Sequence, residues 1–225
     1  MPMHSAADKE CTTNGYNQVL YMEEYPLQIR DAVSLLKRMQ TNSQEMSMWK
    51  NLRLAREVLR LLDSIPARGE SHTPYDKIFL LDILCDNLSN RDLPRFTIGV
   101  LERMQELSEL VQEGDTAEYD SPLTGEDIAQ ELEKWRRYVD TAHVSDEEWV
   151  EEYGIHLKFD PVERTQLWEE LYETVERQTD AEIGSDFPRG MGFCYVYWHT
   201  KTAVLAQHGI EWRSPACMNP GTLFD

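Results

Sequence analysis

The sequence predicts an all-α protein, a bundle of about seven to eight helices with an irregular, aromatic segment at its C-terminal end. At five places a Ser, Thr or Asp stands three residues before an acidic or amide side chain. At this spacing the two side chains satisfy free amide groups at a helix start. Between these places, apolar residues recur every three or four positions, as on one face of a helix. The five pairs are Thr41 with Gln44, Thr73 with Asp76, Thr124 with Asp127, Ser145 with Glu148, and Asp160 with Glu163.

The first half of the chain is expected to hold four helices, over 26–40, 44–64, 75–88 and 94–112. The second has apolar residues at helical spacing with bases between them, which predicts an amphipathic helix with a basic outer face. The third is apolar nearly all round, which predicts a central buried helix. The basic outer face of the second helix carries Arg53, Arg56 and Arg60.

Four more helices are expected in the second half, over 125–142, 146–153, 161–179 and 192–208. The one strand-like alternation, at positions 155–159, is too short to predict a sheet. Prolines at two expected first helical positions, and glycines where a helix would need a left-handed terminating residue, support these boundaries. They are Pro74 and Pro161, and Gly114, Gly154 and Gly209.

Negative charge is concentrated in one third of the chain. Residues 113–186 hold 23 Asp and Glu against six Lys and Arg, in a protein with a net charge of −19. A turn-rich stretch over 113–123 coincides with the change in charge. We therefore expect a flexible tail over 1–20, a helical module over 21–112 and an acidic helical module over 113–225, with one continuous domain as the alternative.

The charge and composition narrow the classes of partner. A strong negative field favours basic protein surfaces and cations over direct binding to nucleic acid or to an anionic membrane. No apolar run approaches the roughly 18 residues that would cross a bilayer, and the first 18 residues are polar. Four scattered cysteines do not make a disulfide scaffold, so we expect a cytoplasmic protein.

Two thiols and two imidazoles near the C-terminal end are the strongest candidates for metal binding or catalysis. Such a set can bind structural zinc, but zinc motifs pair ligands two to five residues apart at both ends, whereas here the later gaps are nine residues each. Nothing marks a nucleophilic cysteine with its base, so we expect no metal ion and no cofactor. The four candidates are Cys194, His199, His208 and Cys217.

Carboxylates at helical spacing over 169–176 are the candidates for partner binding. Pairs three residues apart share a helix face and can hold magnesium, but the second acidic motif that such enzymes need is missing. A solvated face is the simplest interpretation, and a surface for a basic partner is the functional one. The residues of that surface would be Glu169, Glu170, Glu173 and Glu176, with Trp168 and Tyr172 as its apolar centre.

The last 39 residues are aromatic and are bent by prolines and glycines. We expect most of these rings to cap the core, with a docking surface as the alternative. The amino-acid sequence of this block resembles the C-terminal end of uncharacterised bacterial proteins, some of mobile elements. The resemblance implies no known activity. It rests on Tyr197-Trp198, Lys201, Leu205, the run from Gly209 to Pro215, Met218-Asn219-Pro220 and Phe224-Asp225.

The sequence favours a non-enzymatic binding or regulatory protein whose acidic helices engage a basic protein partner, with imitation of the nucleic-acid phosphate array as one form. DNA presents about one charge per 1.7 Å of axis, and acids on successive helical turns give comparable spacing. A metal-dependent or Cys/His enzyme is one alternative. The other is a structural or assembly subunit that forms a homo-oligomer.

Overall fold

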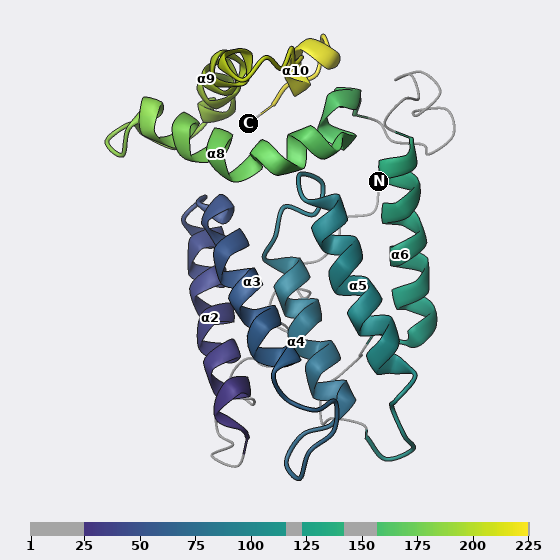
Figure 1. Ribbon diagram of the computed structural model, residues 1–225. Coiled ribbons are helices and arrows are strands. Elements are labelled where there is room, and N and C mark those ends of the chain that lie inside the picture. The colour runs from purple at the N-terminus through teal and green to yellow at the C-terminus, as the bar shows by residue number, and fades with distance from the viewer. Residues whose placement is uncertain (1–24, 116–122, 142–156, 225) are drawn as a thin grey trace. The chain divides into compact units, whose positions relative to one another are not determined.

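A computed structural model describes residues 25–115, 123–141 and 157–224. In these residues the protein is all-α, with eight α-helices, two short 3₁₀ helices and no strand (Figure 1), which confirms the predicted fold class. The helix expected over 146–153 lies outside the described residues. The elements are α2 (Leu27–Gln44), η1 (Met48–Lys50), α3 (Asn51–Asp63), α4 (Pro74–Asp86), α5 (Pro94–Ser108), α6 (Gly125–Asp140), η2 (Pro161–Arg164), α8 (Gln166–Ile183), α9 (Phe193–Gln207) and α10 (Pro215–Met218).

The chain divides into two compact units. Unit 1 consists of Met1–Leu88 and Val100–Glu131, and unit 2 consists of Ser89–Gly99 and Leu132–Asp225. Unit 2 includes a short segment before α5 and at its start, and the later division between the units falls within α6. None of the described helices is both long and apolar enough to cross a membrane.

Two of the predicted helix starts are confirmed as capping boxes. The hydroxyl of Thr73 accepts a hydrogen bond from the amide of Asp76, whose carboxylate accepts one from the amide of Thr73, with Pro74 as the first residue of α4. Thr124 and Asp127 make the same reciprocal bonds before α6. The start at Ser145 lies outside the described residues.

The other two starts are placed differently from the prediction. Thr41 does not begin a helix, because α2 runs on to Gln44 and the Thr41 hydroxyl donates to the carbonyl of Lys37 inside it. Asp160 caps only η2, and the longer α8 begins at Gln166 after a cap by Thr165. A Ser, Thr or Asp three residues before an acidic or amide side chain thus marks a helix start only where the backbone before it is not already helical.

The expected glycine terminators have mixed outcomes. Gly209 follows α9 with a φ of +76°, in the left-handed region that glycine tolerates, as predicted. Gly114 also has a positive φ, but α5 ends earlier, at Ser108, so this glycine lies in a turn beyond the helix. Gly154 lies outside the described residues.

In unit 1, α2 packs against α3 and α4, and the three helices lie side by side in Figure 1. Their buried side chains recur at the helical period, which explains why these segments fold as predicted. On α3 the exposed side carries the expected basic residues, and Arg60 forms an ion pair with Glu57. The buried apolar residues of the three helices include Ile29, Val33, Leu36, Met39, Leu52, Val58, Leu62, Ile78, Leu81 and Leu84.

Asn51 explains why the helix expected over 44–64 is shorter. Its side chain is fully buried and donates to the carbonyls of Met39 and Asn87 at 2.9 and 2.8 Å. Met46, with a φ of +56°, lies in the turn that separates α2 from η1. These bonds fix the first residue of α3 against α2 and against the end of α4.

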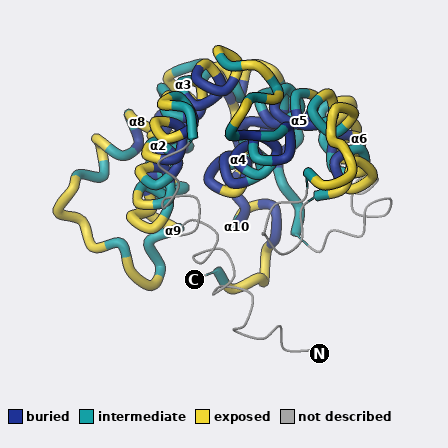
Figure 2. Tube along the Cα trace, turned by 90° about the horizontal axis from the view of Figure 1, so that it is seen from below, coloured by how far each residue is buried: buried dark blue, intermediate teal, exposed yellow. Residues whose placement is uncertain are grey.

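Helix α4 is the central buried helix that the sequence predicts, and its trace is largely dark blue in Figure 2. Even its lysine is inside: the Lys77 ammonium donates to the carbonyls of Leu62 and Ile65 at 2.6 and 2.8 Å. Burial lowers the pKa of Lys77. An apolar helix can thus hold a charge where backbone carbonyls solvate it.

Asp82 on α4 gives unit 1 a testable pH dependence. Burial, with a contribution from Asp86, raises the pKa of Asp82 to about 6. The unfolded-state pKa is about 3.9, so the folded protein holds more protons between these values and its stability falls as pH rises through this window. Asp82→Asn is expected to raise the free energy of unfolding at pH 7 by roughly 1–3 kcal/mol, and to change it little near pH 4.

Urea denaturation of Asp82→Asn at the two pH values measures the difference. Asp31→Asn, which changes an exposed carboxylate of α2, is the matched control, with an expected effect within about 0.5 kcal/mol at both pH values. An equal gain at pH 4 and pH 7 for Asp82→Asn would contradict a raised pKa in the folded protein.

Candidate functional site

Helices α8 and α9 of unit 2 pack against each other. The hydroxyl of Thr165 caps α8 by accepting a hydrogen bond from the amide of Trp168. Gly184 ends α8 with a φ of +81°, and Gly192 precedes α9 with a φ of +78°, so the connection turns at two residues without a side chain. The sequence thus defines both ends of what we call the α8–α9 pair.

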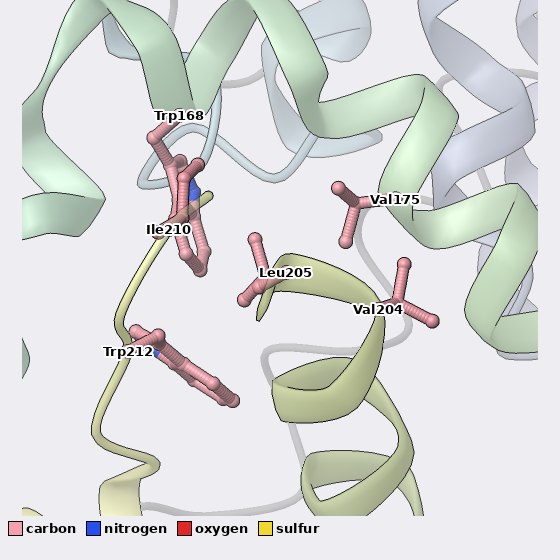
Figure 3. Packing of buried hydrophobic residues seen from close by; sticks show 6 residues of the cluster. All are labelled: Trp168, Val175, Val204, Leu205, Ile210 and Trp212. Atoms are coloured by element: carbon pink, nitrogen blue, oxygen red, sulfur yellow. The ribbon is translucent and has the colours of Figure 1, made fainter. Parts of the chain in front are cut away.

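A buried apolar cluster holds the α8–α9 pair together (Figure 3). It combines side chains from α8, from α9 and from the segment that follows α9, and two of its indole rings lie 5.8 Å apart between centroids. The C-terminal block therefore contributes to the core, but of its seven aromatic rings Trp212 alone is buried, whereas the expectation was that most would cap the core. The members of the cluster are Trp168 and Val175, Val204 and Leu205, and Ile210 and Trp212.

The structure corrects the role expected for Trp168 and Tyr172. Their exposed fractions are 3% and 6%, so they lie inside the protein instead of forming the apolar centre of a partner surface. The physical reason is helical spacing, because positions 168, 172, 175, 176 and 179 share the face of α8 that packs inward. Glu176 lies on the same face and is also buried, so the expectation of a solvated carboxylate ladder fails there.

Glu176 forms a buried ion pair with Lys201 of α9. The ammonium nitrogen lies 2.6 Å from Oε1 of Glu176, and both side chains are less than a tenth exposed. Three aromatic rings surround the ammonium, with centroids 4.7 Å away for Trp168, 5.5 Å for Tyr197 and 5.6 Å for Trp212. Carboxylate and ring faces together replace the water that the cation loses.

This environment fixes the protonation state of Lys201. Burial alone would lower the pKa of Lys201, but the negative charges of Glu176 and Asp92 and the hydrogen bond to Glu176 act against it, and the pKa is raised well above its ordinary value. Burial raises the pKa of Tyr197 well above its ordinary value, so its hydroxyl donates to Glu176 at 2.6 Å as a neutral phenol. Lys201 is therefore a permanent cation and unsuited to act as a nucleophile.

Two further carboxylates bind the buried indoles. The indole nitrogen of Trp168 donates to Asp92 at 2.9 Å, and that of Trp212 donates to Glu163 at 2.8 Å. Burial would raise the pKa of Asp92, but the charges of Lys201 and Arg91, together with hydrogen bonds from Ser89 and Trp168, lower it. Glu163 is almost fully buried, and burial raises its pKa. These carboxylates fix ring positions and are structural components of unit 2.

The remaining α8 candidates separate into a structural residue and two with access to solvent. The carboxylate of Glu169 accepts hydrogen bonds from the amides of Arg95 and Phe96, at 3.0 and 2.7 Å, and so caps the start of α5. Glu170 is exposed and Glu173 is partly exposed. Of the four expected partner-binding carboxylates, only these last two lie where a partner could reach them.

Part of the acidic region's charge is paired within the protein. Among the residues that the structure describes, at least six carboxylates of the region 113–186 form ion pairs with bases that lie outside that region. Acids of this segment therefore pair with bases elsewhere in the fold. The pairs are Asp115 with Arg68, Asp160 with Arg213, Glu163 with Arg91, Glu169 with Arg95, Glu176 with Lys201, and Asp180 with Arg189.

The structure does not bring the Cys and His candidates into a metal site. In the described part of the chain, no three His, Cys, Asp or Glu side chains gather to hold a metal ion. His199 and Cys217 are exposed, whereas Cys194 is partly buried. The Nε2 atom of His208, the residue at the C-terminal end of α9, lies 2.7 Å from the side-chain oxygen of Gln178.

The outward side of α9 carries no Asp, Glu, Lys or Arg. Lys201 is the single residue of these four types in this helix and it is buried, whereas the exposed positions hold Tyr, Val, His, Ala and Gln. From the 3.6-residue turn, the exposed positions span about 120° of the helix, one continuous side. We call them the α9 stripe: Tyr195, Val196, His199, Ala203, Ala206 and Gln207.

More exposed apolar side chains precede α9. Phe187 is 41% exposed and Met191 is 92% exposed, and within the stripe Tyr195 is 43% exposed. The aromatic C-terminal block therefore divides into a core part and a surface part. Exposed apolar groups that lie together are the ones that need an explanation, since single ones are common on any surface.

Sequence reasoning missed the pairing of Glu176 with Lys201 and the role of Asp92. One signal was present: a lone lysine in an otherwise apolar helix must either reach solvent or find a buried carboxylate. Asp92 gave no such signal, because it lies far away in the sequence and is brought in by the fold.

Comparison of the chain with protein-family models, with curated proteins and with solved structures gave no significant match. The function proposed below therefore rests on the residues and geometry of this chain alone.

A double-mutant cycle tests the buried pair. Glu176→Gln and Lys201→Met are each expected to lower the free energy of unfolding by about 3–5 kcal/mol, because each leaves an uncompensated buried charge. The double variant is expected to be destabilised by about 1–3 kcal/mol less than the sum of the two single effects, since neither Glu176 nor Lys201 is then left without the other. Chemical denaturation provides the measurement.

Glu170→Gln is the matched control, an exposed carboxylate on the same helix with an expected effect within about 0.5 kcal/mol. Strict additivity of the two buried substitutions would contradict the coupling of Glu176 and Lys201.

Proposed function

We propose that this protein is a non-enzymatic binding protein that engages a basic protein partner through exposed carboxylates of unit 2. The observation that supports this most is the location of charge around the α8–α9 pair. Two bases there, Lys201 and Arg189, are in ion pairs with Glu176 and Asp180. Glu170, Glu182 and Asp186 are exposed, and so is one base of α8, Arg177. Exposed carboxylates therefore predominate on the surface around the pair.

A basic protein fits this surface better than the alternatives. A net charge of −19 repels nucleic acid and anionic lipid, and it steers a basic protein toward the surface. Imitation of nucleic acid needs acids on successive exposed turns. On α8 that series is interrupted, because Glu169 and Glu176 are used inside the protein and Arg177 is exposed. We therefore propose recognition of a basic protein without phosphate mimicry.

The enzyme alternative receives no support from the described residues. Lys201 and Glu176 satisfy each other in the interior, and the pKa of Lys201 is raised, opposite to what a nucleophilic amine requires. The exposed thiol of Cys217 and imidazole of His199 have no described neighbours that would form a metal site with them. A binding role uses the features that the surface does present.

Salt and charge reversal test the proposal once a partner has been isolated by co-purification and purified. The dissociation constant is expected to rise at least tenfold between about 50 and 300 mM salt, because exposed charges are screened over a Debye length that falls below 10 Å. The triple variant Glu170→Lys, Glu182→Lys, Asp186→Lys is expected to weaken binding at least tenfold at low salt while the melting transition is retained. Calorimetric titration measures both effects.

A matched control separates local recognition from overall charge. Glu45→Lys, Glu70→Lys, Glu109→Lys makes the same change in net charge on exposed positions of unit 1 and is expected to alter the affinity less than threefold. Equal losses in the two triple variants, or an affinity that ignores salt, would contradict recognition by the carboxylates of unit 2.

A further inference from the structure

Helix α9 reverses the usual arrangement of an exposed helix. A helix at the surface buries its apolar face and presents charges to water, whereas a helix that is apolar all round is normally covered on every side. In α9 the one charged residue, Lys201, is buried and the stripe that faces water is uncharged. The helix thus has the composition of an element with a second packing partner, in addition to α8.

We propose that the α9 stripe binds one face of an amphipathic helix of the basic partner. This inference rests on the function proposed above and adds where the apolar part of the contact lies. The two sides of α9 would then have different tasks: Lys201, Val204 and Leu205 pack inward, and the stripe packs against the partner. A helix that binds an apolar surface contacts it through side chains at positions i, i+3, i+4 and i+7. The stripe can match this spacing.

Charges at both ends of α9 define the chemistry of the occupant. Glu182 and Asp186 are exposed before the helix, and Glu211 is exposed after it. A partner helix with an apolar face and Lys or Arg along its edges would meet apolar groups in the middle and carboxylates at the ends. This is the arrangement of interfaces in general, with an apolar centre and a polar rim.

A second copy of this chain fits less well. In a symmetric pair the same patch meets itself, so the carboxylates at the ends of the two stripes would face each other. Each copy also carries a net charge of −19, and the exposed stripe offers no Lys or Arg to compensate it. A basic helix removes this repulsion and a second copy increases it.

The stripe is partly pre-organised for binding. The ring of Tyr195 lies 5.7 Å from that of Trp198, which in turn lies 5.0 Å from that of Phe224, both in edge-to-face contact. A ring held in place loses little conformational freedom on binding, which is why tyrosines so often dominate interface energies. Tyr195 is therefore the expected anchor of the contact.

A defined probe tests this directly. A fluorescein-labelled 18-residue peptide, with Leu at i, i+3, i+4 and i+7 and Lys on both edges, is titrated with the full chain at 50 mM salt and followed by anisotropy. We expect saturable binding, at least tenfold weaker for a peptide of the same composition whose leucines do not form a stripe. Tyr195→Ser with Val196→Ser is expected to weaken binding at least tenfold.

Controls keep the outcomes separate. Leu27→Ser with Leu110→Ser removes two exposed apolar residues from unit 1, which are 60% and 51% exposed, and is expected to change the affinity less than twofold. Because all four positions are exposed, circular dichroism and melting should be unchanged in both variants.

Each result is decisive. Losses in both the Tyr195→Ser, Val196→Ser variant and the charge-reversal variant of unit 2 support the inference and the proposed function together. If only charge reversal weakens binding, the stripe is not the docking site, although the proposed function stands. If only the stripe variant weakens binding, and salt has no effect on the affinity, then the proposal of a basic partner helix and the proposed function both fail. No saturable binding of the peptide, or a dimer in sedimentation velocity that the stripe variant abolishes, overturns the inference.

Discussion

The buried ion pair between Glu176 and Lys201 is the constraint on which unit 2 depends. It joins α8 to α9 through a 2.6 Å contact, and the rings of Trp168, Tyr197 and Trp212 surround the cation. Such a pair adds little stability over apolar residues of the same volume, but either charge is costly without the other. Its larger effect is on orientation. Because Lys201 must face inward, α9 has one allowed orientation about its own axis. In that orientation its uncharged side faces the solvent.

The acidic region has two roles that its composition does not distinguish. Some of its carboxylates are internal: Glu169 caps α5, Glu163 holds the indole of Trp212, and Asp160 pairs with Arg213. Others, such as Glu182 and Asp186, remain at the surface. The net charge of the region counts both sets of carboxylates equally. Only the carboxylates at the surface can attract a basic partner. The proposal of a basic partner therefore depends on which carboxylates the fold leaves outside.

Local signals in the sequence predicted the helices well where a single segment decides the outcome. The Thr73–Asp76 capping box and the apolar run of α4 act within a few residues, and both are confirmed. The helix expected over 44–64 begins late, because Asn51 bonds to carbonyls of Met39 and Asn87 that are distant in the chain. The candidate surface was harder for the same reason. Spacing placed Trp168, Tyr172 and Glu176 on one face of α8, but only packing decides that this face is the inner one.

The most direct measurement of the central claim is hydroxyl-radical footprinting of the protein with and without its basic partner. The account predicts that Met191 and Tyr195, exposed in the free protein, become protected in the complex. Met46 of unit 1, which is 58% exposed, should react at the same rate in both states. Unchanged reactivity of Met191 and Tyr195 in a saturated complex would contradict the account, because the uncharged side of α9 would then remain in water while the partner is bound.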